Sequence, residues 1–255
     1  MWRASVPLRA DIRAFRKARE KFDLYPLAIH VSYLVNLATL DPVIREKSIL
    51  AFRGELERAS MIGAEYLVTH PGNYRGHSVE EGVASFVLGM CEAARGLKLS
   101  GLTVLLENTV GAGAQIGSKL EELRDIRDLA ARERKSLRIG YCLDTCHLFA
   151  AGFDIAQPDG LDSTVAHIDR VLGLENVHVI HTNDSKQTLG SRVDRHANIG
   201  EGHIGEAGFR LILQHPALRT KPFILETPVD EEGDDRRNLD ALKRLSETKH
   251  AAPRR

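Results

Sequence analysis

Short apolar runs alternate with longer segments of helical periodicity along the whole chain. The apolar runs predict six β-strands, at 27–31, 66–70, 102–107, 139–144, 177–181 and 223–226. Their high content of Val, Ile and Leu is typical of parallel strands that are covered on both faces. Three segments have the apolar spacing of amphipathic helices, namely 42–61, 78–97 and 118–134, with Pro42 and Ser118 as start signals and Gly63 as a stop signal. Repeated strand–helix units of this length predict a parallel sheet or an α/β barrel.

The two ends of the chain differ from this pattern. The N-terminal segment 1–21 is rich in arginine, but it contains acidic residues and lacks the apolar stretch of a secretory signal. The spacing of Ile12, Phe15 and Phe22 indicates an amphipathic helix rather than a transit peptide. We expect residues 248–255 to form a disordered tail. Because no linker-like stretch interrupts the alternation, we expect one domain over residues 1–255.

Composition narrows the class of protein. The chain has 255 residues, of which 43% are hydrophobic and 27% are charged, so it can bury a core. Its 35 basic and 35 acidic residues give no overall field that would attract a polyanion, although a local basic groove is compatible with this balance. No apolar run reaches the roughly 18 residues that span a bilayer, so we expect no membrane insertion. Three cysteines cannot form a closed disulfide set, which predicts a cytoplasmic protein with Cys142 and Cys146 as reduced, partly buried thiols.

Each predicted strand ends in a side chain that can bind a metal ion. These residues are His30, His70, Glu107, Asp144, His181 and Glu226, and they recur at intervals of about 40 residues. In a (β/α)8 barrel they would meet at the C-terminal rim, where the active sites of this fold lie. An open doubly wound sheet would spread them along a line, so the pattern favours the barrel. Because three carboxylates at close range repel one another, their combination with imidazoles favours a divalent cation.

Two local motifs add candidate ligands. Asp144 and His147 are three residues apart at a junction between a strand and a helix, close enough to serve one ion. Asp194 and His196 form an Asp-x-His triplet, which points both side chains to the same side if the loop is extended. Taken alone, either motif is equally well explained by a capping aspartate beside a surface histidine.

Eight segments, in this order along the chain, resemble endonuclease IV, the zinc-dependent apurinic/apyrimidinic endonuclease family of DNA repair. They are HVSYL at 30–34, HPG at 70–72, ENT at 107–109, LDTCH at 143–147, HTND at 181–184, GSRVDRH at 190–196, GEGHIG at 200–205 and LET at 225–227. The DTCH and SRVDRH runs are the most specific of these motifs. The resemblance covers nearly the whole chain.

The resemblance implies a TIM barrel with three zinc ions on its rim, Mn²⁺ being an alternative for one of them. His30, His70 and Glu107 would hold the first ion, Glu107, Asp144, His181 and Glu226 the second, and His147, Asp194 and His196 the third. Enzymes of this family cut the phosphodiester 5′ to an abasic site and leave a 3′-hydroxyl and a 5′-deoxyribose phosphate. Glu107 is the expected catalytic residue, since it would bridge two ions and orient the attacking hydroxide.

The resemblance also implies that the partner is double-stranded DNA with abasic sites, bound by a monomer. Tyr33 and Leu34 would belong to a loop that enters the minor groove at the lesion, although packing against the barrel rim explains both residues equally well. The basic residues of the expected rim loops are candidates for phosphate contacts, namely Arg75, Lys186, Arg192 and Arg195.

The sequence departs from the family at its start. The family has two further strands, with a helix and a recognition loop, before the strand that ends at His30, and six strands do not close an eight-stranded barrel. We therefore expect additional sequence upstream, with a truncated relic or a covering partner as alternatives.

Two other functions compete with the nuclease. A sugar isomerase or epimerase of the xylose-isomerase class would hold one or two Mn²⁺ or Mg²⁺ ions. An inactive barrel would bind DNA or metal without cleavage. The additional imidazoles of His147 and His196 favour zinc and several ions.

Overall fold

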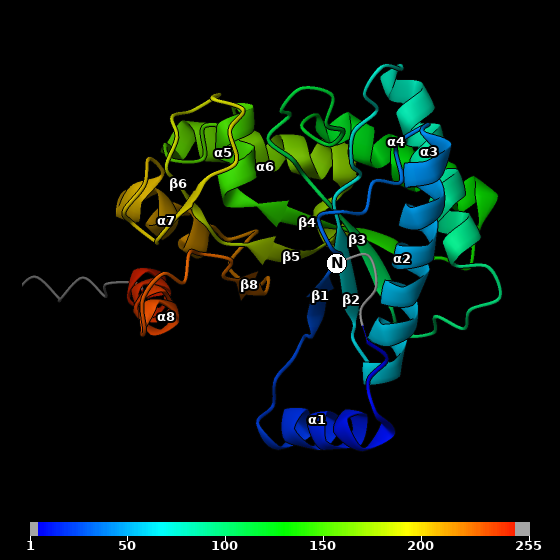
Figure 1. The fold of residues 1–255 in the computed structure, drawn as a ribbon. Helices are drawn as coiled ribbons and strands as arrows, with labels where there is room; N and C mark the ends of the chain where they lie inside the picture. The colour runs from blue at the N-terminus through cyan, green and yellow to red at the C-terminus, as the bar shows by residue number, and fades with distance from the viewer. Residues whose placement is uncertain (1–4, 248–255) are drawn as a thin grey trace, which may run out of the picture. The chain divides into compact units, whose positions relative to one another are not determined.

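The computed structural model of the chain describes residues 5–247 (Figure 1). These residues belong to two compact units, Met1–Cys142 and Leu143–Arg255. The predicted tail at 248–255 lies outside the described part, and the expectation of a single domain stays a prediction. Among the described residues, no helix is both long enough and apolar enough to cross a bilayer.

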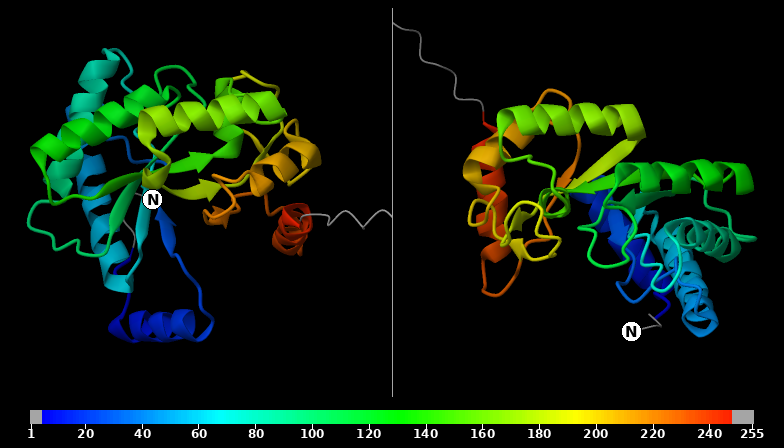
Figure 2. Two further views of the ribbon diagram at one scale, coloured as in Figure 1. Left: turned by 180° about the vertical axis from the view of Figure 1, so that it is seen from behind. Right: turned by 90° about the horizontal axis from the view of Figure 1, so that it is seen from above.

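The first unit is built on four parallel strands in the order β1–β2–β3–β4. They are β1 (Ala28–His30), β2 (Tyr66–Thr69), β3 (Thr103–Glu107) and β4 (Ile139–Asp144), whose last two residues already belong to the second unit. The intervening helices α2 (Pro42–Ile62), α3 (Val79–Ala93) and α4 (Leu120–Glu133) lie on one side of these strands (Figures 1 and 2). Every side chain of β3 is buried, as expected for a strand that is covered on both faces. The strands and helices predicted for this part of the chain are therefore confirmed.

The helix boundaries follow local capping chemistry. The Asp41 carboxylate accepts the N–H groups of the first turn of α2, Pro42 occupies its first position, and Gly63 ends it with φ 77°. The predicted start at Ser118 is wrong, because α4 begins at Leu120 and no side chain caps it. The Glu122 carboxylate instead accepts the Gly117 N–H at 2.7 Å, which fixes the turn before the helix.

The predicted N-terminal helix is present as α1 (Arg9–Lys21), but its apolar positions do not attach it to the unit. Phe15 and Phe22 are 43% and 62% exposed. The attachment is polar: the buried Arg19 donates to Leu24 O at 2.8 Å and to Gly63 O at 2.7 Å, and it pairs with the Glu65 carboxylate. The helix is thus held by hydrogen bonds to the turn that joins α2 and β2.

The second unit contains α5 (Thr145–Ala151), α6 (Pro158–Leu172), the short 3₁₀ helix η1 (Leu174–Asn176), α7 (Gly205–Gln214) and α8 (Asp234–Ser246). Strand β5 (Val177–His181) runs parallel to the short β8 (Phe223–Ile224), and both were predicted. An antiparallel hairpin of two-residue strands, β6 (Asp184–Ser185) and β7 (His196–Ala197), was not predicted, because its polar sequence has no apolar alternation.

Candidate metal centre

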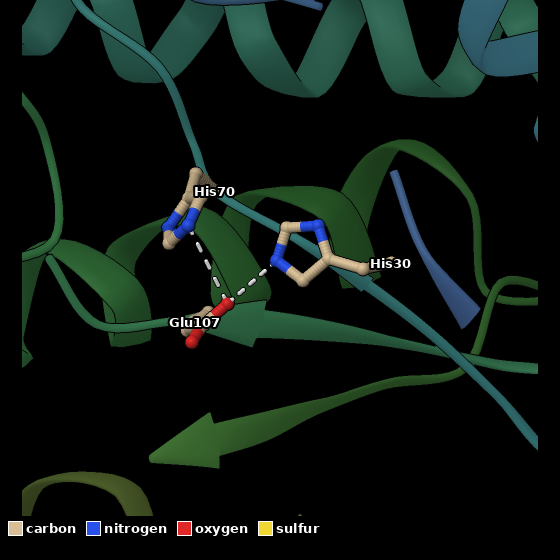
Figure 3. Close-up of side chains that lie close together, drawn as sticks. All are labelled: His30, His70 and Glu107. Carbon is tan, nitrogen blue, oxygen red and sulfur yellow. Dashed lines mark hydrogen bonds and ion pairs between the residues drawn. The ribbon is translucent and has the colours of Figure 1, made fainter. Parts of the chain in front are cut away.

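Three predicted ligands meet at the carboxyl ends of the first three strands. His30 and Glu107 are the last residues of β1 and β3, and His70 directly follows β2. Both imidazoles point toward the Glu107 carboxylate (Figure 3): Oε2 lies 2.9 Å from His30 Nε2 and 3.5 Å from His70 Nε2. The parallel register places these strand ends at one edge of the sheet, so the prediction that they would meet there is confirmed.

The His30 ring is oriented for coordination. Its Nδ1 lies 2.7 Å from the carbonyl oxygen of Val31, and because a carbonyl only accepts, Nδ1 carries the proton. Its Nε2 faces the Glu107 carboxylate at 2.9 Å, so this is the ring nitrogen that would be available to a cation at the group. A backbone carbonyl that fixes the tautomer in this way is usual for a metal-binding histidine.

A second group of ligands lies in the second unit. His147, in the first half of α5, and His196, the first residue of β7, both face Asp194 in the loop between β6 and β7. The Asp194 carboxylate oxygens lie 3.2 Å from His147 Nε2 and 3.2 Å from His196 Nε2. The His196 Nδ1 lies 3.0 Å from the carbonyl oxygen of Glu226, which again fixes the ring. The Asp-x-His triplet therefore does present both side chains to one point.

The charges within this group are set by contacts between its members, which outweigh the effect of burial. Burial alone would lower the pKa of His196, but the hydrogen bond to Asp194 and the charge of Asp144 raise it to about 9. Burial would raise the pKa of Asp194, but the bonds and charges of His147 and His196 hold it well below its usual range. Without a metal ion, the group is a cluster of close ion pairs, in which the buried Nε2 atoms of His147 and His196 meet Asp194 as ion pairs rather than in hydrogen bonds of good geometry.

A third group joins Asp144, His181 and Glu226, whose ligand atoms lie within 4.8 Å of one another. Asp144 ends β4, His181 ends β5, and Glu226 follows β8. The His181 Nδ1 lies 3.1 Å from the Glu226 carboxylate. Asp144 also caps α5 by accepting the His147 N–H at 2.7 Å, so the capping explanation of this motif and the ligand explanation are compatible.

The donor sets fit a divalent cation. Each group offers imidazole nitrogens and carboxylate oxygens within 4.8 Å of one another, the ligands that Zn²⁺ takes in proteins. Cys146 lies close to Asp144 and His196, and burial, followed by the charge of Asp144, raises the pKa of its thiol to about 12. Cys142 and Cys146 are fully buried rather than partly buried as predicted.

The candidate DNA-binding residues of the first unit lie on loops that are fixed to each other. Asn36 donates to Asn73 O and accepts from Asn73 N, both at 3.1 Å, which joins the loops after β1 and β2. At Gly72, φ is 95° and a Cβ atom would lie 2.2 Å from Asn36 Oδ1, so only glycine allows this approach. Tyr33 on the first loop is 88% exposed, which is at odds with packing against the rim, and Arg75 on the second is exposed. Leu34 is half-buried.

The other candidate DNA-binding residues lie between β6 and β7. Lys186, Arg192 and Arg195 are all exposed. Arg192 has a φ of 57°, which is uncommon for a residue with a side chain. Its N–H donates to Ala150 O at 2.9 Å, and this bond to the end of α5 holds the unusual backbone in place.

Sequence reasoning missed the residue that fixes the loop after β7. The Asp184 carboxylate is fully buried and accepts five backbone N–H groups. Their donors are Ser185 at 2.8 Å, Ile204 at 2.9 Å, Gly202 at 2.9 Å, Gly200 at 3.0 Å and Gly205 at 3.2 Å. A Cβ atom at Gly202 would lie 2.5 Å from this carboxylate, which explains this glycine of the GEGHIG run, while Gly200 and Gly205 have φ values of 86° and 68°. The close spacing of the glycines in this run was the sequence signal for a tight loop.

Residues 2–247 match the family model of the xylose isomerase-like TIM barrels, which confirms the predicted fold class. A probable endonuclease 4 from Solibacter usitatus is 65% identical over the whole chain and 88% of its own length. A probable endonuclease 4 from Chloroflexus aurantiacus is 41% identical over 96% of this chain and 85% of its own length. The chain belongs to the endonuclease IV family.

Solved structures agree with this assignment. The crystal structure of endonuclease IV from Thermus thermophilus matches with a TM-score of 0.82 at 37% identity, over 96% of this chain and 84% of that one. A D-tagatose 3-epimerase-like protein matches with a TM-score of 0.66 at 18% identity, a likeness of fold alone. The alternative of a sugar isomerase or epimerase is therefore supported by the fold alone.

Proposed function

We propose that the protein is a DNA-repair endonuclease that cleaves the phosphodiester 5′ to abasic sites in double-stranded DNA, leaving a 3′-hydroxyl and a 5′-deoxyribose phosphate. The observation that carries the proposal is the gathering of imidazoles and carboxylates into compact groups, each from a motif of the endonuclease IV family. The 65% identity to a probable endonuclease 4 supports the same reaction.

The proposed cofactor is three Zn²⁺ ions per chain, with Mn²⁺ as an alternative for one. His30, His70 and Glu107 would hold one ion, Asp144, His181 and Glu226 another with Glu107 as a bridging ligand, and His147, Asp194 and His196 the third. When bound, the ions supply a nucleophile at neutral pH and neutralise charge on the phosphate. The protein orients the ligands: the carbonyls of Val31 and Glu226 fix the rings of His30 and His196.

Incision of a duplex that contains one tetrahydrofuran abasic analogue tests the proposal. We expect a cut 5′ to the analogue, no cut in the undamaged duplex, and loss of incision by about 10³-fold or more after treatment with EDTA, because the ligand groups then lack their cations. Added Zn²⁺ should restore the activity. Binding without incision by zinc-loaded protein would instead support the inactive barrel.

We expect Tyr33→Ala to weaken binding to the abasic duplex by about 10-fold, the loss typical of one aromatic contact with a base. Because an abasic sugar leaves the stack at little cost, the exposed tyrosine has room to enter the duplex at the lesion. Affinity for the undamaged duplex should change less. Phe22→Ala, which removes another exposed aromatic side chain of the same unit, is the control and should leave both affinities unchanged.

The salt dependence of DNA binding tests the phosphate contacts of Arg192 and Arg195. Each change to Ala should lower the slope of log K against log salt by about 1, because each contact releases one counterion. Arg236→Ala removes an exposed charge on α8 and should leave the slope unchanged. Equal slopes for all three variants would contradict the assignment. The same binding titrations, followed by sedimentation, would test the expected monomer.

A further inference from the structure

Asn183 is fully buried and hydrogen-bonds to two members of the Asp144–His181–Glu226 group. Its Nδ2 donates to Asp144 Oδ2 at 2.5 Å. Its Oδ1 accepts the backbone N–H of Glu226 at 2.9 Å. The third member, His181, lies two residues earlier in the chain, at the end of β5. One amide side chain therefore connects the ends of β4, β5 and the segment after β8.

Asn183 is itself held in place. Its backbone N–H donates to Thr145 Oγ1 at 2.9 Å, and that hydroxyl donates to Asn183 O at 2.7 Å. Thr145 is buried in the first turn of α5. Two reciprocal bonds to a buried hydroxyl fix the backbone from which the amide extends, so the amide has a defined direction.

The two bonds fix different features of the ligands. Asp144 Oδ1 is already engaged by the His147 N–H, so the bond from Asn183 to Oδ2 leaves the carboxylate a single orientation. The pairing between β5 and β8 ends at Ile224. Beyond it, the side-chain oxygen Oδ1 of Asn183 accepts a hydrogen bond from the Glu226 N–H. This bond sets where the Glu226 side chain leaves the backbone.

We propose that Asn183 is a positioning residue, which holds Asp144 and Glu226 in a binding arrangement with His181 before the cation arrives. The inference rests on the proposed metal centre. It requires an amide, because one end must donate to a carboxylate and the other must accept from an N–H. An aspartate would place a second negative charge against Asp144, and an alanine would leave both ligands without this support. Residues that orient metal ligands in this way typically contribute 10- to 100-fold to metal affinity.

Zinc binding by Asn183→Ala and Asn183→Asp tests the proposal. After equilibration with a zinc-buffered chelator, we expect both variants to retain about one Zn²⁺ fewer per chain, with the affinity of the lost ion weakened by about 10- to 100-fold. In the Co²⁺-substituted protein, the absorption bands of the ion bound by Asp144, His181 and Glu226 should be lost. Excess zinc should restore incision in Asn183→Ala, since the change removes support and no ligand.

Thr182→Val is the matched control. Thr182 directly precedes Asn183 and is equally buried. Within the described part of the chain, its hydroxyl donates only to Ile180 O, at 3.2 Å. It should keep the wild-type zinc content even if its melting temperature falls. Wild-type zinc content and Co²⁺ spectrum in both Asn183 variants, or equal zinc loss in Thr182→Val, would overturn the proposal. Failure of the metal centre itself is distinguishable, because the wild-type protein would then bind no zinc.

Discussion

Glu107→Gln is expected to lower the rate of incision at an abasic site by about 10³-fold or more while the protein stays folded. Glu107 is fully buried, and its carboxylate lies 2.9 Å from His30 Nε2 and 3.5 Å from His70 Nε2. Glutamine keeps the volume but removes the carboxylate charge that would help to hold a cation in the proposed metal centre. The single-turnover rate on the tetrahydrofuran duplex, measured at saturating zinc, gives the size of the effect.

The control for this change is Glu92→Gln, which neutralises a half-exposed glutamate that pairs with Arg45 at 3.6 Å on the helical side of the same unit. It should keep the full rate. Both variants should melt within a few degrees of the wild type, as followed by circular dichroism. Full activity in Glu107→Gln would remove this residue from the proposed chemistry.

Asp184→Ala is expected to destabilise the second unit by about 3–5 kcal/mol, because a buried donor that loses its acceptor costs about 1–3 kcal/mol and several do so here. The change leaves five backbone N–H groups of the loop without their acceptor. Denaturant unfolding followed by circular dichroism measures the loss.

The effect should reach the metal ligands as well. Asp184 pairs with Ala197 in the β6–β7 hairpin, directly beside His196, so loss of the loop should also weaken zinc binding at the group of His147, Asp194 and His196. Asp230→Ala, which removes an exposed carboxylate of the same unit, should change the stability by less than about 0.5 kcal/mol. An equally small change in Asp184→Ala would show that solvent replaces the carboxylate.

The strands and the candidate ligands at their ends could be predicted because one physical rule governs them. Buried parallel strands need apolar side chains along their length, so the polar residue at each end, such as His30 or Glu107, stands out in the sequence. The same contrast located β4 and β5 to the residue. The ligands of the hairpin came from motif spacing instead.

The parts that could not be predicted depend on contacts between distant residues. Asn183 and Asp184 look like ordinary loop residues until the fold brings Asp144, Glu226 and the glycine loop to them. The partners of Arg19 could not be predicted either, because Gly63 and Glu65 are more than forty residues away in the sequence. Apolar spacing predicted the helix that carries Arg19 but not how it is attached.

The β6–β7 hairpin supplies part of the candidate ligand set independently of the parallel strands. Asp194 and His196 are supplied by the arm 186–195 and the residue that follows it, whereas His30, His70, Glu107, Asp144 and His181 end or directly follow strands of the parallel type. Deleting this arm together with the residue that follows it would remove two candidate donor side chains from the group with His147 and leave the parallel strands intact. The size of the candidate ligand set therefore depends on the length of one loop as well as on the strands.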